Sequence, residues 1–153
     1  MKTLTIGDLK ARIPIIQGGM GVGISLSGLA SAVANEGGIG VISAAGLGLL
    51  YKKLSPSNYT EAGNLGLAEE IRKAREKAKG IIGVNVMVAL SDFAELVKTS
   101  IAEKVDIIFS GAGLPLDLPS FLKKDSVTKL VPIVSSARAV RIICEKWKNN
   151  YDY

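Results

Sequence analysis

The stretch that decides the fold is residues 81–88, IIGVNVMV, a nearly unbroken apolar run rich in β-branched side chains. Such a run predicts a strand buried on both faces, which is typical of parallel sheets covered by helices. An amphipathic helical pattern precedes it at 65–78, and a second pattern follows Ser91 and Asp92. The sequence therefore predicts parallel strands that are joined by helical crossovers.

The same alternation extends along the chain in both directions. Further strands are predicted at 13–17, 39–43, 105–110 and 130–135, and further helices at 27–35, 93–101, 115–124 and 136–149. Residues 44–63 are rich in Gly, Ser, Asn and Tyr and predict a long surface loop. Five βα units in one domain, residues 1–153, fit either an open doubly wound sheet or part of a (β/α)8 barrel, because a whole barrel needs roughly 200 residues or more.

Composition indicates a globular protein of a reducing compartment. The chain has 153 residues, of which 48% are hydrophobic and 22% charged, and its net charge is +5. Basic and acidic residues alternate on helical faces without aromatic neighbours, so nucleic-acid binding is not expected. Cys144 is the single cysteine and is predicted to be a buried apolar residue. No stretch approaches the length of a membrane span and no signal-type pattern begins the chain, so we expect a cytoplasmic protein.

The carboxyl ends of the predicted strands carry small or uncharged polar residues. These ends are residues 17–21, 43–46, 85–87, 110–113 and 135–136. Ligands of parallel α/β proteins bind at such ends, and glycines, amides and hydroxyls suit a large, flat, hydrogen-bonding ligand. The alternative is that these residues only form the tight turns that any α/β protein needs. The residues alone leave both interpretations open.

Two other chemistries are excluded by spacing and composition. The glycines of 18–23 do not form a dinucleotide fingerprint, because Leu26 occupies the third glycine position when Gly21 and Gly23 are taken as the first two. The sequence contains no histidine, which excludes Ser/His/Asp and Cys/His catalysis. We assign no catalytic residue and no metal ligand.

Residues 14–25, PIIQGGMGVGIS, resemble the opening of the nitronate monooxygenase family, formerly called 2-nitropropane dioxygenases, and of the related FMN-dependent enoyl-ACP reductases. The motifs GGIGVIS at 37–43, GVNVM at 83–87, SGAG at 110–113 and PIVSS at 132–136 follow in the order of that family. The resemblance covers essentially the whole chain. It implies a partial (β/α)8 TIM barrel of about five βα units that binds FMN at its carboxyl-terminal mouth.

The resemblance also implies which residues contact the cofactor. Gly19 and Met20 would contact the flavin ring through their backbone, and Asn85 would bond near the ring or the ribityl chain. The full set implied is Gly18, Gly19, Met20, Asn85, Ser110, Gly111, Ala112 and Ser135. The implied activity is oxidation of alkyl nitronates with O2, and the alternative is reduction of an enoyl thioester with NAD(P)H. In both cases the partner is a small-molecule substrate.

The chain departs from the family in one respect. Relatives continue into a sixth strand that ends in Gly-Gly-His, whose histidine is the implied base, and later strands bind the FMN phosphate. A third interpretation is therefore a non-catalytic truncated chain, or a half-barrel that needs a C-terminal partner chain. Five strands leave two open edges, and the predicted interior side chains would lose their opposing layer, so we expect marginal stability or self-association. These interior residues are Ile15, Val41, Val84, Ile107 and Ile133.

Overall fold

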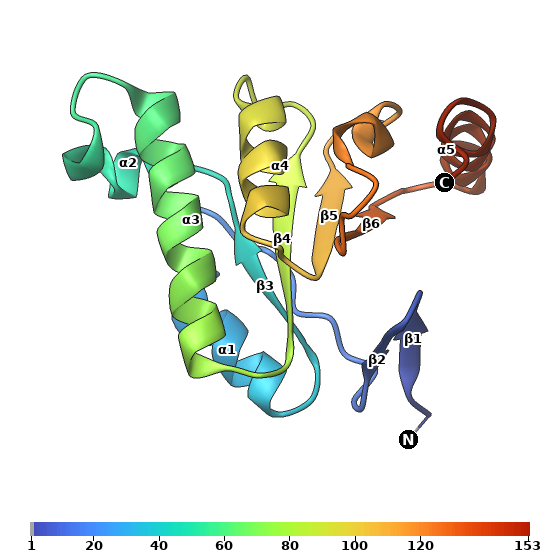
Figure 1. The fold of residues 1–153 in the computed structure, drawn as a ribbon, viewed down its shortest axis with the longest axis horizontal. Coiled ribbons are helices and arrows are strands. Elements are labelled where there is room, and N and C mark those ends of the chain that lie inside the picture. The colour runs from blue at the N-terminus through green and yellow to red at the C-terminus, as the bar shows by residue number, and fades with distance from the viewer. Residues whose placement is uncertain (1) are drawn as a thin grey trace.

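The computed structural model describes residues 2–153 and contains a four-stranded parallel sheet (Figure 1). Its strands are β3 Ile39–Ser43, β4 Ile81–Met87, β5 Ile107–Gly111 and β6 Lys129–Pro132. They lie side by side in chain order, and each is parallel to the next. A doubly wound sheet would reverse this order, so the sequential order identifies the barrel type of sheet. The prediction of a partial (β/α)8 barrel is confirmed.

Helices connect the strands and cover one face of the sheet (Figure 1). The helices are α1 Ser27–Asn35, α2 Leu47–Leu50, α3 Tyr59–Lys77, α4 Phe93–Ala102 and α5 Ala137–Tyr151, with short 3-10 turns η1 Lys52–Leu54 and η2 Leu118–Phe121. The helix predicted at 27–35 has the observed bounds. In the segment 115–124, which was predicted to be a helix, only the short turn η2 is helical.

The first predicted strand, residues 13–17, is an extended segment beside β3 rather than a full strand. Its one ladder contact is a parallel bridge between Ile16 and Ile39. The Ile39 N–H donates to the Ile15 carbonyl over 2.9 Å, and the Gln17 N–H donates to the Ile39 carbonyl over 3.0 Å. Ile15 is 56% exposed. The segment therefore occupies the position of a first strand, with an apolar and unpaired outer side.

The two faces of the sheet bury different clusters. Val41 and Ile107 point to the inner face, as predicted, and pack with Phe109. Val84 belongs to the cluster under the helices, so its prediction as an interior residue is wrong. The inward position beside it is Gly83, where the Phe109 ring takes the space that a side chain would need. Strand alternation therefore places Val84 outward.

A β-hairpin that sequence analysis did not predict closes one end of the inner face (Figure 1). Its strands are β1 Leu4–Ile6 and β2 Leu9–Ala11, which are antiparallel. Gly7 has φ +59°, a conformation that favours glycine, and turns the chain between them. Asp8 pairs with Lys129 over 2.7 Å and ties the hairpin to β6. Leu4, Ile6 and Leu9 thus cover the inner cluster.

The segment 44–63 is more helical than predicted. It contains α2, η1 and the first turns of α3, which begins at Tyr59 rather than at residue 65. Asn58 caps α3, because its side chain accepts a hydrogen bond from the Glu61 N–H over 3.1 Å. Gly66 lets the Tyr51 ring pack directly on α3, since any side chain there would overlap that ring.

Helix α5 packs on the rest of the molecule through a narrow apolar stripe. Ile143 and Trp147 are its buried residues, and the Trp147 indole N–H donates to the Pro115 carbonyl over 3.0 Å. Ser136 caps the helix by accepting from the Ala139 N–H. Cys144 lies on the exposed side of this stripe, so the prediction that it is buried is wrong. Across residues 2–153, α5 included, no helix combines the length and apolarity needed to cross a membrane.

Candidate flavin-binding mouth

Two uncharged side chains fix the loop that follows the extended segment. The Gln17 carboxamide forms two hydrogen bonds to the backbone of Val41 on β3. It donates to the Val41 carbonyl over 3.0 Å and accepts from the Val41 N–H over 3.2 Å. The Ser25 hydroxyl donates to the Gly18 carbonyl over 3.1 Å and accepts from the Met20 N–H over 2.9 Å. Loop 17–25 therefore has a defined shape over the end of β3 without any charged group.

Gly19 and Asn85 come together at this end of the sheet. A Cβ built on Gly19 would overlap the Asn85 side chain, so glycine lets the loop lie directly on it. Asn85 on β4 is paired in register with Ser43 on β3. Within residues 2–153 the side-chain amides that form hydrogen bonds are those of Gln17, Asn35, Asn58 and Asn64, and the partly exposed Asn85 carboxamide is not among them. An amide in this setting can bond a ligand that enters the mouth.

Gly18 and Met20 form the open side of the loop. A Cβ built on Gly18 would meet no atom within 4 Å. Met20 is 61% exposed. In the described chain, the N–H groups of Gly18 and Gly19 have no protein partner. A flat ring can therefore approach this backbone and receive hydrogen bonds from it.

The other predicted residues divide between the mouth and the far side of the sheet. Gly111 ends β5, and its carbonyl accepts from the Val88 N–H over 2.8 Å. Ala112 follows with φ 53° and is exposed. The Ser110 side chain lies on the helix-covered face, as alternation from Phe109 requires, and its buried hydroxyl has no partner in the described residues. Ser135 is exposed in the turn between β6 and α5.

The residues at the mouth fit the ring of a flavin better than its phosphate. They offer free backbone N–H groups at Gly18 and Gly19 and a carboxamide at Asn85 that needs a partner, all without charge. A neutral polar lining suits a ring that carries carbonyl and N–H groups. A phosphate is usually held by basic side chains or helix N-termini, and no lysine or arginine belongs to the candidate set. In residues 2–153 no cluster of His, Cys, Asp or Glu side chains could hold a metal.

One residue that was not predicted from the sequence, Glu70, holds the start of the helix that follows loop 17–25. Glu70 on α3 is 4% exposed, and its carboxylate accepts from the Ser27 N–H at the start of α1 over 2.6 Å. It also accepts from the Tyr51 hydroxyl, and the Lys73 ammonium lies 3.7 Å away. Glu70 therefore fixes the start of α1, the helix that follows loop 17–25. Its position three residues after Leu67, on the apolar side of the helix, was the available signal.

These contacts change the acidity of the carboxyl and of the phenol. Burial acts most strongly on the Glu70 carboxyl and would raise its pKa, but the hydrogen bonds from Tyr51 and Ser27 together outweigh it and hold the pKa below its usual value. Burial, followed by the hydrogen bond to Glu70, raises the pKa of Tyr51 to about 12. Glu70 is therefore a charged, hydrogen-bonded anchor rather than a proton donor at neutral pH.

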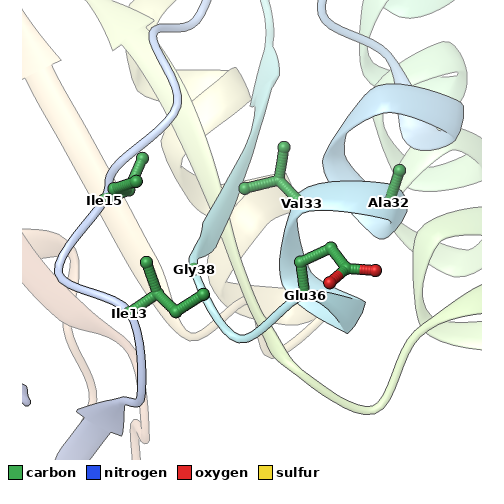
Figure 2. Close-up of a pocket in the computed structure, with 6 residues that line it drawn as sticks. All are labelled: Ile13, Ile15, Ala32, Val33, Glu36 and Gly38. Atoms are coloured by element: carbon green, nitrogen blue, oxygen red, sulfur yellow. The ribbon is translucent and has the colours of Figure 1, made fainter. Parts of the chain in front are cut away.

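An apolar cavity of the described chain lies away from the mouth. It has a volume of about 350 Å³ and lies between the extended segment and α1 (Figure 2). Its lining residues are Ile13, Ile15, Ala32, Val33, Glu36 and Gly38. Gly38 precedes β3, so this cavity is at the amino end of the strand and along the open edge. It does not contribute to the candidate flavin site.

Comparison with known proteins decides the family. A family model described as nitronate monooxygenase matches residues 2–151. The chain belongs to the nitronate monooxygenase family. Members of this family are flavin-dependent enzymes. No curated protein matches the chain.

Solved structures agree with this family and with its barrel fold. FabK from Thermotoga maritima is similar with a TM-score of 0.66 and 28% identity, over 87% of this chain and 37% of that chain. A substituted form of the same protein is similar with a TM-score of 0.69 and 31% identity, over 87% of this chain and 40% of that chain. The chain thus spans about two-fifths of the length of these neighbours. Its sheet and helices correspond to that part of a TIM barrel.

Proposed function

We propose that this nitronate monooxygenase family chain forms the ring-binding side of an FMN site in a flavin-dependent oxidoreductase. The observation that carries the proposal is the contact between Gly19 and Asn85, which joins an open backbone loop to an unpartnered carboxamide. Both lie at the carboxyl end of the parallel sheet, where ligands of this fold bind. Membership of a flavin-dependent family supports the same cofactor.

Each predicted cofactor-binding residue has a binding or positioning role in this proposal. The Gly18 and Gly19 N–H groups donate to the ring, Met20 covers one side of it, and the Asn85 carboxamide bonds a polar ring edge or the ribityl chain. Gly111, Ala112 and Ser135 line the opposite rim, where Ser110 contributes only backbone. FMN, when bound, supplies the redox chemistry. No catalytic acid or base is assigned to a residue of this chain.

The proposed substrate is an alkyl nitronate, with O2 as the oxidant. The family description supports this choice. The test is to mix the flavin-loaded protein with an alkyl nitronate in the absence of O2 and to follow the visible flavin band. The proposal expects that band to bleach and to return when O2 is admitted. A band that stays unchanged with every nitronate, while NAD(P)H bleaches it, would contradict this substrate class.

The second candidate is reduction of an enoyl thioester with NAD(P)H. The similarity to FabK, an enoyl-ACP reductase of this family, favours it. In the same assay this function predicts bleaching by NAD(P)H and recovery of the band when an enoyl thioester is added. A third candidate is a chain that binds flavin only together with a C-terminal partner chain. Flavin retention by the chain alone separates that candidate from the other two.

Asn85 gives the sharpest test of the binding site itself. Asn85→Ala removes the carboxamide, and FMN affinity should fall about tenfold, since a hydrogen bond of about 1.4 kcal/mol corresponds to that factor. Asn35→Ala is the matched control, because Asn35 is an exposed residue of α1 whose amide bonds the Lys77 carbonyl. Equal FMN affinity for the two variants, measured by fluorescence titration, would contradict the assignment of Asn85.

A further inference from the structure

A second cavity lies on the helix-covered face of the sheet, where the crossover between β5 and β6 is thin. Seventeen residues, 112–128, connect these strands, yet they contain only the four-residue turn η2. The other crossovers contain a full helix, α3 between β3 and β4 and α4 between β4 and β5, which covers the sheet (Figure 1). The space beside α4 is therefore left as a hollow of about 700 Å³. This volume falls within the range of small-molecule sites.

The floor of this hollow is apolar. Ile101 of α4 and Phe121 and Leu122 of the crossover line it. All three pack against the main core and remain partly exposed, and the Phe121 ring meets the Phe93 ring edge-to-face at 6.3 Å. The floor is thus part of the packed structure, and its apolar surface is exposed to solvent. Burial of that surface by a ligand would be favourable.

The rim of the hollow is basic. Lys98, Lys104 and Lys123 line it, and Asp125 is the carboxylate among the lining residues. Lys98 pairs with Glu95 over 2.8 Å. In the described chain, Lys104 and Lys123 have no acidic partner within salt-bridge distance. Two unpaired cations above an apolar floor complement a ligand that has an anionic head and an apolar body.

We propose that this hollow binds a soluble single-chain amphiphile with a carboxylate head. The alkyl chain lies on Ile101, Phe121 and Leu122, and the carboxylate faces Lys104 and Lys123. The site is separate from the flavin mouth, because Asn85 and Gly111 lie at strand ends on the inner side, whereas α4 covers the outer side. Binding at the hollow should therefore proceed with and without FMN.

The experiment is calorimetric titration of the full chain with decanoate below its micelle concentration. Saturable binding of one decanoate per chain is expected, with decanol at least tenfold weaker because it lacks the charge. Lys123→Glu should weaken decanoate binding about three- to tenfold, as expected for replacing an attractive charge by a repulsive one near the surface. Lys124→Glu is the matched control, since Lys124 is an exposed neighbour that does not line the hollow.

A second variant tests the floor without touching the charges. Ala102→Phe fills the hollow from the exposed end of α4, and it should abolish decanoate binding while the melting temperature stays near that of the parent. Equal affinity for decanoate and decanol, or equal weakening by Lys123→Glu and Lys124→Glu, would overturn the proposal. Binding to vesicles of anionic lipid without binding of decanoate would also overturn it, because the basic rim would then serve a membrane surface.

Discussion

Replacement of Glu70 by alanine should lower the free energy of unfolding by about 3 kcal/mol. The variant leaves the buried Ser27 N–H and the half-buried Tyr51 hydroxyl without their acceptor. A buried unpaired donor costs about 1–3 kcal/mol, and we take about 2 for Ser27 and about 1 for Tyr51, which water reaches in part. The free energy of unfolding falls by about 2 kcal/mol per molar urea, so the urea concentration at the unfolding midpoint should fall by about 1.5 M.

The assay is urea denaturation followed by far-ultraviolet circular dichroism. Glu69→Ala is the matched control, because Glu69 is a neighbouring carboxylate that is partly exposed and, among residues 2–153, pairs only with Lys73. Glu69→Ala should leave the midpoint almost unchanged. Equal midpoints for Glu70→Ala and Glu69→Ala would refute the reasoning, since Glu70 would then hold nothing that water cannot replace.

The pH dependence gives a further check on Glu70. Its pKa in the folded state is below the ordinary value, so its charge stabilises the fold fully above the unfolded-state pKa of about 4.3. That contribution is lost as pH falls through the folded-state pKa. The stability difference between the parent and Glu70→Gln should therefore be constant from pH 5 to 7 and shrink below about pH 4. A difference that grows on acidification would contradict the assigned direction.

Two other predictions concern packing and the open edge. Gly40→Ala should destabilise the fold by about 1–3 kcal/mol in thermal melts, because its Cβ would overlap the Ala30 carbonyl and push α1 off β3. An unchanged melting temperature would mean that this helix is not seated on the strand. Ile15→Lys should weaken self-association at least tenfold in sedimentation velocity, because Ile15 is exposed beside an unpaired edge. Leu49→Lys, at an exposed site on α2, is its control, and an equal effect would show that the edge is not the contact.

Local patterns in the sequence predicted the four strands of the parallel sheet and most helices well. Apolar runs such as residues 81–88 identify buried parallel strands, and Gly37 with φ +89° follows the end of α1. The hairpin at residues 4–11 carried an alternating pattern with Gly7 and Asp8 at its turn, but strands of three residues are too short to stand out. The alternation of strands and helices left an open doubly wound sheet possible, and the family resemblance of the motifs was what predicted the barrel type of sheet.

Contacts between distant residues account for what the sequence could not predict. The first N–H of α1 has no side-chain cap nearby in the sequence and is satisfied by Glu70, 43 residues later in the chain. Likewise, Ser110 belongs to a motif of the mouth, but strand alternation turns its side chain to the other face. The motifs of the resemblance lie at the ends of the strands, whereas the direction of each side chain depended on pairing with neighbouring strands.

We propose that FMN lies against the open side of loop 17–25, and a flavin titration of two glycine variants tests this placement. A Cβ on Gly18 or on Gly28 meets no protein atom within 4 Å, so neither alanine variant should harm the fold. We expect the parent and Gly28→Ala to retain FMN with a perturbed visible spectrum after free flavin is removed, and Gly18→Ala to bind it at least tenfold more weakly. Equal retention by both variants, or no retention by the parent, would contradict it.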